Sequence, residues 1–290
     1  MFQGTLIYGF INSVILALVA LGFNLTFGIS GVANFAYGAL YIFAGFFTWI
    51  LFSMLKIPYL LAVILSIFIT ACIGAFMYRF VLLRVRGLAV SEVIASFGMG
   101  LVILETFRFL GFVGFQYTLP VFIPGSIPMG RTFVDVQRLL IVGIGIVLAI
   151  FLWIFTHYTK TGLAFRGIAQ DERTALALGI DSDRAAMLSM AFGAGLAAVA
   201  AIVILPLGTI AVEGGYSVLL NALAVCIVGG LGSTGGVVLA SFVIGYGQIF
   251  TSTYLGSHWI MIVSLVAILI ILVLKPSGLF GKQKELEERI

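Results

Sequence analysis

The side chains that could do acid–base chemistry are few in this sequence and lie far apart along the chain. Three glutamates, Glu92, Glu105 and Glu213, fall in or beside long apolar runs of the kind that cross membranes. A charge at a bilayer centre costs roughly 2.5–3.5 kcal/mol on insertion scales, so unpaired ones are rare. Arg108 follows Glu105 by three residues, which favours a structural ion pair near the outer interface. We expect Glu92 to reach water at the inner end of its run, and Glu213 to lie in a solvated turn.

No metal or nucleophilic site can be read from the remaining reactive residues. His157 and His258 are expected at opposite membrane faces, and no Cys/His ligand cluster accompanies either of them. Cys72 and Cys226 lie inside apolar runs, where cysteine is usually a small buried hydrophobe. No Gly-Lys-Ser/Thr follows the glycines at 229–236, so a phosphate-binding loop is not expected there. We therefore expect no catalytic chemistry and no cofactor in this chain.

The composition indicates that the solvent of most of this chain is lipid. It is 62% hydrophobic and 9% charged, with a mean hydropathy of +1.24, whereas soluble domains are about 25% charged. A spanning helix needs about 20 apolar residues. We predict one all-α polytopic membrane domain over residues 1–290, with roughly nine transmembrane helices, some broken at glycine-rich segments. The expected spans are 6–27, 34–55, 59–82, 89–112, 139–157, 186–205, 216–228, 237–254 and 259–274, of which the seventh is too short for a regular crossing.

The basic residues predict the orientation. They gather at 79–86, at 160–184 and from Lys275 onwards, and nine spans place all three groups on one face. Basic residues concentrate on the cytoplasmic side, so we expect the N-terminus outside and a short cytoplasmic tail at 276–290. The Pro- and Gly-containing segment 116–136 is then an outside loop. A basic stripe for nucleic acid is absent from the sequence, so no nucleic-acid partner is expected.

The charged segment at 158–185 stands alone between long apolar runs. Asp171 can cap a short helix whose first turn carries Glu172, and Gly179 supplies a C-terminal stop before Asp181 starts the next turn. Residues 175–178 give this helix an apolar side. The sequence therefore predicts one short amphipathic helix outside the bilayer, and an ordinary solvated loop is the alternative.

Two further segments contain polar or glycine residues inside the apolar chain. Asn34 and Tyr37 stand at the start of the second span, with Gly38 and Gly45 permitting close approach of a neighbouring helix. Glycines at 229–236 can break a helix where its backbone lines a cavity rather than lipid. Tight helix packing is the alternative explanation for both segments.

Four motifs in order resemble one family. They are Asn34-Phe35-Ala36 with Gly38, the segment from Gly162 to Gly179-Ile180, Gly229–Ser233, and the ending Lys275–Gly281. The chain is similar, from about Leu6 to Gly281, to permease subunits of the branched-chain amino acid (hydrophobic amino acid uptake, LivH-like) ABC importers. Family members commonly have His or Gln where this chain has Tyr37, which leaves the choice of substrate open.

The resemblance implies a multi-pass protein of the bacterial inner membrane and a division of labour among subunits. A sibling permease (a LivM-like heterodimer), two cytoplasmic ATPase subunits that bind ATP and Mg, and an extracytoplasmic binding protein are the implied partners, besides membrane lipid. The solutes implied are branched-chain amino acids, urea, short amides or aromatic acids. An ion-coupled secondary transporter with Glu105 as the titrating carboxylate is the alternative, although such proteins usually need chained ionisable groups.

Two sets of residues follow for these roles. The expected pathway residues are Asn34, Phe35, Tyr37, Gly38, Tyr41, Gly229, Gly230, Gly232 and Ser233. The expected ATPase-coupling residues are Arg166, Asp171, Glu172, Arg173, Ala177 and Gly179.

Overall fold

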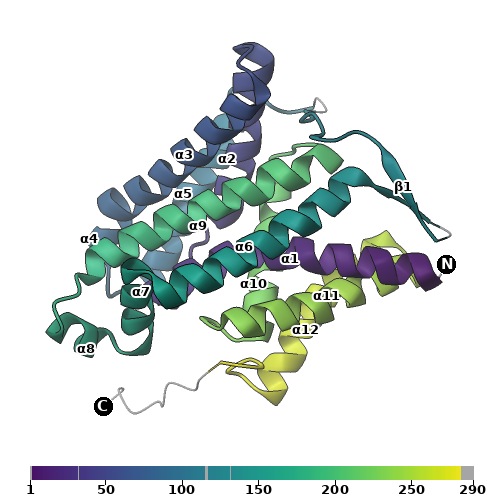
Figure 1. Ribbon diagram of the computed structural model, residues 1–290. Helices are drawn as coiled ribbons and strands as arrows, with labels where there is room; N and C mark the ends of the chain where they lie inside the picture. Colours follow the sequence, from purple (N-terminus) through teal and green to yellow (C-terminus); the bar gives the residue numbers. More distant parts are fainter. Residues whose placement is uncertain (1, 32, 115–116, 131, 282–290) are drawn as a thin grey trace.

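The computed structural model describes residues 2–31, 33–114, 117–130 and 132–281 (Figure 1). In this part of the chain, eight helices are long and apolar enough to cross a membrane, and a ninth apolar helix is shorter. The predicted all-α polytopic architecture is confirmed in that form. The short helix is α10 (Gly214–Gly229), where the sequence predicted a span too short for a regular crossing.

The other elements agree with the expected spans to within a few residues. The first half contains α1 (Phe2–Ser30), α2 (Tyr37–Trp49), η1 (Ile50–Met54), α3 (Tyr59–Met77), η2 (Tyr78–Leu82), α4 (Leu83–Val85) and α5 (Ala89–Phe109). The second half contains β1 (Ser126–Met129), β2 (Thr132–Asp135), α6 (Val136–Tyr158), α7 (Lys160–Gln170), α8 (Glu172–Ala177), α9 (Ser182–Ile204), η3 (Leu205–Leu207), α10, α11 (Thr234–Tyr254), η4 (Ser257–Trp259) and α12 (Ile260–Leu274).

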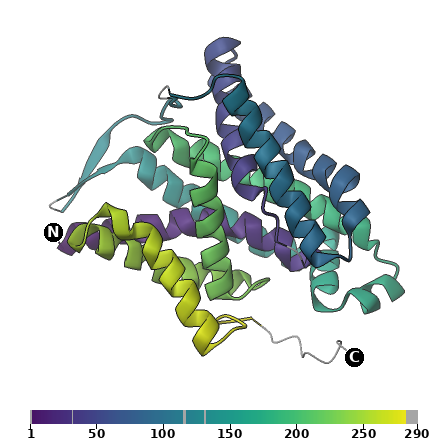
Figure 2. The ribbon, with the colours of Figure 1, turned by 180° about the vertical axis from the view of Figure 1, so that it is seen from behind.

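Helices α1 and α9 form the centre of the bundle. In each of them 67% of the residues in the apolar stretch are buried, against 11% in α12. Small residues allow the close approach: a Cβ placed on Gly193 of α9 would lie 2.1 Å from the Thr26 hydroxyl of α1, and one on Gly74 of α3 would lie 2.6 Å from the Met190 carbonyl. Such small-residue contacts are how helices associate in lipid, where apolar burial gives little driving force. Seen from behind, α10 runs between α5 and α12 (Figure 2).

The predicted outside loop is not irregular throughout. β1 and β2 pair antiparallel, with Ile127 opposite Val134, and the turn uses Gly130 at φ +65°. Val134 is fully buried, and the Tyr8 hydroxyl of α1 donates to the Phe133 carbonyl at 2.9 Å. The hairpin is thereby attached to the start of α1, as Figure 1 also shows. Gln116 and Arg131 of the predicted loop, and residues 282–290 of the predicted tail, lie outside the described residues.

Candidate functional site

The helix predicted at Asp171 is present, and its ends have the predicted chemistry. The Asp171 carboxylate accepts the Arg173 N–H at 2.9 Å and the Thr174 hydroxyl at 2.5 Å. These bonds, that of the Thr174 side chain first, hold the pKa of the Asp171 carboxyl below its usual value. Gly179 ends the helix at φ +82°, and Asp181 caps α9 by accepting the Arg184 N–H at 3.0 Å.

The prediction of one helix in this segment was wrong, because α7 precedes α8. Thr159 caps α7 by accepting the Gly162 N–H at 3.0 Å, and Phe165 and Ile168 bury one side of it. Glycine lowers helix propensity, yet Gly162 is required: a Cβ there would lie 1.9 Å from the Phe155 carbonyl. Arg166, predicted on the coupling helix, lies exposed on α7 instead.

Helix α8 is exposed on one side and anchored on the other. Glu172, Arg173 and Ala177 are exposed, and the apolar Leu176 and Leu178 are 52% and 77% exposed. The inner side is a small core in which Ala175 meets residues of α1, α6, α7 and α9, namely Ile29, Phe155, Phe165, Ile168 and Ala185. A force on α8 therefore reaches the two central helices directly.

Arg86, which the sequence analysis did not single out, fastens α8 to the α4–α5 connection. Its guanidinium pairs with Glu172 at 2.5 Å and with Asp183, and it donates to the Ser182 hydroxyl at 2.5 Å. Ser182 in turn donates to Glu172 at 2.5 Å. The partners are too far apart along the chain for spacing to reveal them. Only the general excess of basic residues at 79–86 signalled a role for this segment.

The predicted polar residues at the start of α2 make contacts within the protein. The Asn34 side chain accepts the Ala36 N–H at 3.0 Å, which shapes the turn into α2. Tyr37 is fully buried; its hydroxyl donates to the Val19 carbonyl of α1 at 2.7 Å, and its ring meets Phe23 edge-on at 5.7 Å. Tyr41 is buried in the main core. Within this chain these side chains therefore join α2 to its surroundings.

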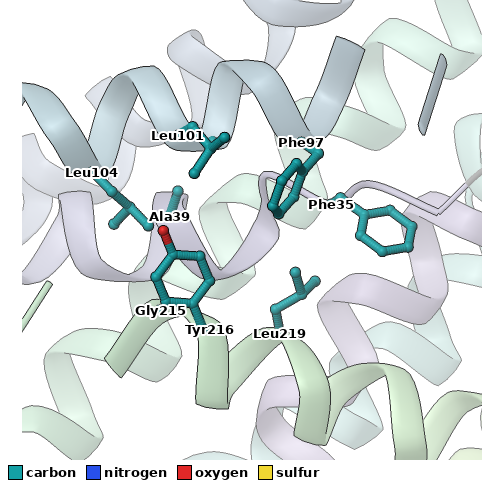
Figure 3. Close-up of a pocket in the computed structure, with 9 residues that line it drawn as sticks. Phe35, Ala39, Phe97, Leu101, Leu104, Gly215, Tyr216 and Leu219 are labelled. Carbon is teal, nitrogen blue, oxygen red and sulfur yellow. The ribbon is translucent and has the colours of Figure 1, made fainter. Parts of the chain in front are cut away.

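Gly38 marks a crossing of α2 and α10, where a Cβ would lie 1.9 Å from the Gly215 carbonyl oxygen. Beside this crossing lies a pocket between α2, α5 and α10, and Figure 3 shows its side chains facing one another. It is lined by Phe35, Ala39, Phe97, Gly100, Leu101, Leu104, Gly215, Tyr216 and Leu219. Its volume of about 10 Å³ is room for one water molecule at most. Of the predicted pathway residues, Phe35 lines this pocket.

The glycines at 229–236 form a tight turn between α10 and α11. Gly230 and Gly232 have φ of +97° and +83°, which side chains disfavour. The Gly232 N–H donates to the buried Asn24 amide of α1 at 2.8 Å, and Ser233 caps α11. The segment 275–281 joins the turn from the other end of the chain. Its Leu279 and Phe280 N–H groups donate to the Val228 and Gly229 carbonyls at 2.9 and 3.0 Å.

The acidic residues beside the spans all have partners. The predicted Glu105–Arg108 pair is confirmed at 2.5 Å, and Arg108 also reaches Glu213 at 3.1 Å, linking α5 to the start of α10. The pKa of Glu213 is lowered, first by its own backbone N–H and then by Arg108. Glu92 is 8% exposed rather than open to water, and it accepts the Gly87 N–H at 2.7 Å. Within the described ranges, no three His, Cys, Asp or Glu side chains gather as a metal site.

The described members of the three basic groups lie on one face. Arg86 contacts the charged segment at 158–185 through Glu172 and Asp183. That segment shares a core with Ile29 at the end of α1, and a Cβ on the neighbouring Gly28 would lie 3.4 Å from Gly232. The turn at 229–236 carries the segment that begins at Lys275. The opposite face carries the Glu105–Arg108–Glu213 cluster, at the end of α5 and the start of α10. It also carries the β-hairpin, at the start of α1.

Comparison with known proteins gives consistent matches along most of the chain. Residues 5–274 match the family described as "Branched-chain amino acid transport system / permease component". The chain is 26% identical to the permease proteins BraD of Pseudomonas aeruginosa and LivH of Escherichia coli, covering 92% of this chain and 91% of theirs. The probable LivH permease of Methanocaldococcus jannaschii is also 26% identical, over 96% and 91%. The solved structure "PsaBC from Streptococcus pneumoniae in complex with Fab" shares the fold, with a TM-score of 0.52 and 13% identity over 95% and 94% of the chains.

Proposed function

The chain belongs to the family of branched-chain amino acid transport system permease components, and from that premise we propose that it forms part of the route of an ATP-driven importer. It is a multi-pass protein of the bacterial inner membrane, as the resemblance implied. The cargo proposed is a branched-chain or other hydrophobic amino acid, with urea, short amides and aromatic acids as related candidates. The observation that carries the proposal is that α8 is exposed on its outer side and anchored on the two central helices by its inner side.

The chemistry of ATP hydrolysis belongs to partner subunits in this proposal. Two cytoplasmic ATPase subunits bind ATP and Mg, and one of them receives α8 with its exposed Leu176 and Leu178. A sibling permease, LivM-like, completes the route, and an extracytoplasmic binding protein delivers the cargo. The coupling residues proposed are Asp171, Glu172, Arg173, Ala177 and Gly179, with Arg166 contributing from α7.

The proposed topology has nine crossings, the N-terminus outside and the C-terminus cytoplasmic. The shared face of the basic groups supports it, because basic residues favour the cytoplasmic side. Helix α10, with 16 residues, is about 24 Å long. This is shorter than the ~30 Å hydrocarbon layer, so its ends lie within the thickness of the protein, where the Gly38 crossing and the turn at 229–236 surround them.

The proposed route passes along α10. Phe35 and Gly38 lie directly beside it, while Asn34, Tyr37 and Tyr41 hold α2 in place. Gly229, Gly230, Gly232 and Ser233 shape its cytoplasmic end. The small pocket between α2, α5 and α10 is consistent with a closed state, which must widen before a solute passes.

A reconstituted complex with its ATPase subunits, sibling permease and binding protein tests the coupling proposal. Arg173→Glu and Ala177→Glu place a carboxylate on the exposed side of α8, where burial in a docking groove costs several kcal/mol without a partner. We expect transport to fall and to become uncoupled from ATP hydrolysis. Ala169→Glu, the same change at an exposed position of α7, is the matched control. Normal coupling in both α8 variants would refute the docking role.

Two further measurements address topology and the alternative mechanism. A cysteine at the exposed Ser126 should react with an impermeant reagent outside intact cells, and one at Ala177 should not; the reverse pattern would overturn the orientation. Transport that persists without ATPase subunits and is abolished by Glu105→Gln would instead favour an ion-coupled transporter.

A further inference from the structure

Four uncharged polar side chains form a network between apolar helices, apart from the sites above. They come from four elements: Asn12 of α1, Asn221 of α10, Gln248 of α11 and Ser264 of α12. Gln248 and Ser264 are 3% and 2% exposed, while Asn12 and Asn221 are partly buried. Polar side chains join helices in membranes in this way. If the network only joined helices, every hydrogen-bond donor and acceptor of its four side chains would have a partner within it.

One backbone carbonyl fixes the direction of every hydrogen bond in this network. The Gly245 carbonyl can only accept, so the group 3.2 Å from it must be the Asn12 Nδ2. The same Nδ2 donates to Gln248 Oε1 at 3.0 Å. Gln248 Nε2 therefore points the other way and donates to Asn221 Oδ1 at 3.1 Å and to the Ser264 hydroxyl at 2.8 Å.

This direction leaves Asn221 with an unused donor. Its Oδ1 accepts from Gln248 and also from the Ser264 hydroxyl, at 3.0 Å. Its Nδ2 therefore faces out of the network, and no described residue accepts from it. Among the described residues, the fully buried side-chain polar atoms without a partner are the hydroxyls of Tyr59 and Tyr78. The Asn221 Nδ2 has no partner in the described ranges and is not among these fully buried atoms, so it is accessible from outside the chain.

The place of this donor in the bundle makes lipid an unfavourable neighbour. Asn221 lies seven residues after Gly214, the first residue of α10, which is about 10 Å along the helix and inside the hydrocarbon layer. An amide donor without an acceptor is costly there. The adjoining side of α10 is also uncovered, with Ser217 exposed and Leu220 partly exposed.

We infer that Asn221 is a solute-contacting residue of the route, and that Gln248 and Ser264 position its amide. The Nδ2 donates to a carboxylate oxygen of the passing amino acid. A neutral amide suits this task, because it gives a hydrogen bond to the carboxylate without the strong hold of a fixed positive charge. This inference rests on the proposed function, since it takes the cargo to be an amino acid.

The test compares leucine transport per assembled complex among three variants in reconstituted vesicles. Asn221→Asp keeps the shape and the accepting oxygen but replaces the donor with an oxygen that repels a carboxylate. We expect transport at subsaturating leucine to fall about tenfold or more, with normal assembly and normal basal ATP hydrolysis. Asn221→Leu should lose transport similarly. Thr253→Ala, a polar change at an exposed position of α11 outside the network, is the control and should stay within about twofold of the wild type.

A second measurement detects the wet route directly. Asn221→Cys, in a background without Cys72 and Cys226, should react with a hydrophilic thiol reagent, and leucine-loaded binding protein should slow the reaction. Leu269→Cys, at a 64% exposed position of α12, is the lipid-facing control and should stay unreactive. An unreactive Asn221→Cys would overturn the inference.

The remaining outcomes separate this inference from the proposed function. If the assembled Asn221→Asp complex transports leucine as the wild type does, the proposed contact between Asn221 and the solute is overturned, while the proposed function still stands. Failure of the Asn221 variants to assemble with the sibling permease would also overturn it, because the donor would then pair with that subunit. A wild-type complex that hydrolyses ATP but moves no leucine would overturn the proposed cargo and this inference together.

Discussion

Replacing Arg86 with alanine should loosen α8 without unfolding the protein. The side chains of Arg86, Glu172 and Asp183 are 31%, 49% and 52% exposed, so solvent screening limits each ion pair to about 0.2–1 kcal/mol. The hydrogen bond to the buried Ser182 contributes about 0.5–1.5 kcal/mol. Together these give about 2 kcal/mol of local stability, which corresponds to roughly 30-fold in the population of the opened segment.

Hydrogen exchange of the backbone amides at 171–185 measures this opening. We expect faster exchange in Arg86→Ala, by up to about 30-fold, with α1 and the part of α9 after residue 185 unchanged. Arg86→Lys keeps a charge but not the two-pronged geometry and should lie between. Arg84→Ala is the matched control, since Arg84 is exposed and has no ion pair among the described residues. Equal exchange in Arg86→Ala and wild type would refute the reasoning, and so would equal effects at Arg84 and Arg86.

Three other changes have defined outcomes. Tyr37→Phe removes the hydrogen bond to the Val19 carbonyl, which keeps its helical N–H partner within α1. It should destabilise the protein by about 0.5–1.5 kcal/mol, seen as a lower melting temperature in detergent; an unchanged melting temperature would contradict the structural role. Gly38→Ala puts a Cβ 1.9 Å from the Gly215 carbonyl and should reduce folded yield by separating α2 from α10. Gly98→Ala, with nothing within 4 Å, should not, and equal yields would argue against the crossing. The pKa of the Asp171 carboxyl is lowered in the folded protein. Its contribution to folding stability is therefore complete above its pKa in the unfolded chain, about 3.9, and is lost as the pH falls through the lower folded pKa. Amide protection of α8, corrected for intrinsic rates, should therefore be the same at pH 5 and 7, and a loss by pH 5 would count against the cap.

Features encoded within a few residues were predictable from the sequence. Three such features are the cap at Asp171, the stop at Gly179 and the Glu105–Arg108 pair. In each of them the interacting residues are at most three positions apart in the sequence. The lengths of the apolar runs predicted the spanning helices and the short α10, because a helix in lipid needs a long apolar run. Helix α7 was missed because Gly162 and Gly167 weaken its propensity, and only the fold shows that Gly162 meets the Phe155 carbonyl.

Partners distant in sequence were beyond prediction. Tyr37 was expected at the pathway because a polar group in an apolar run needs a partner, and the sequence does not show that Val19 supplies one. Arg86 and Glu172 are brought together only by tertiary packing, in which η2 contacts α9. The network from Asn12 to Ser264 spans almost the whole chain, so no local pattern announces it.

The union of the turn at 229–236 with the segment 275–281 has a consequence for biosynthesis. The Val228 and Gly229 carbonyls are at the end of α10, where helix carbonyls lack internal partners, and they receive the Leu279 and Phe280 N–H groups. These donors leave the ribosome only after α11 and α12 have been made. The Val228 and Gly229 carbonyls therefore lack these two donors until residues 279 and 280 have emerged. A chain that stops after α12 presents the Val228 and Gly229 carbonyls without these donors at this membrane face, so the joined segments report whether synthesis has passed residue 280.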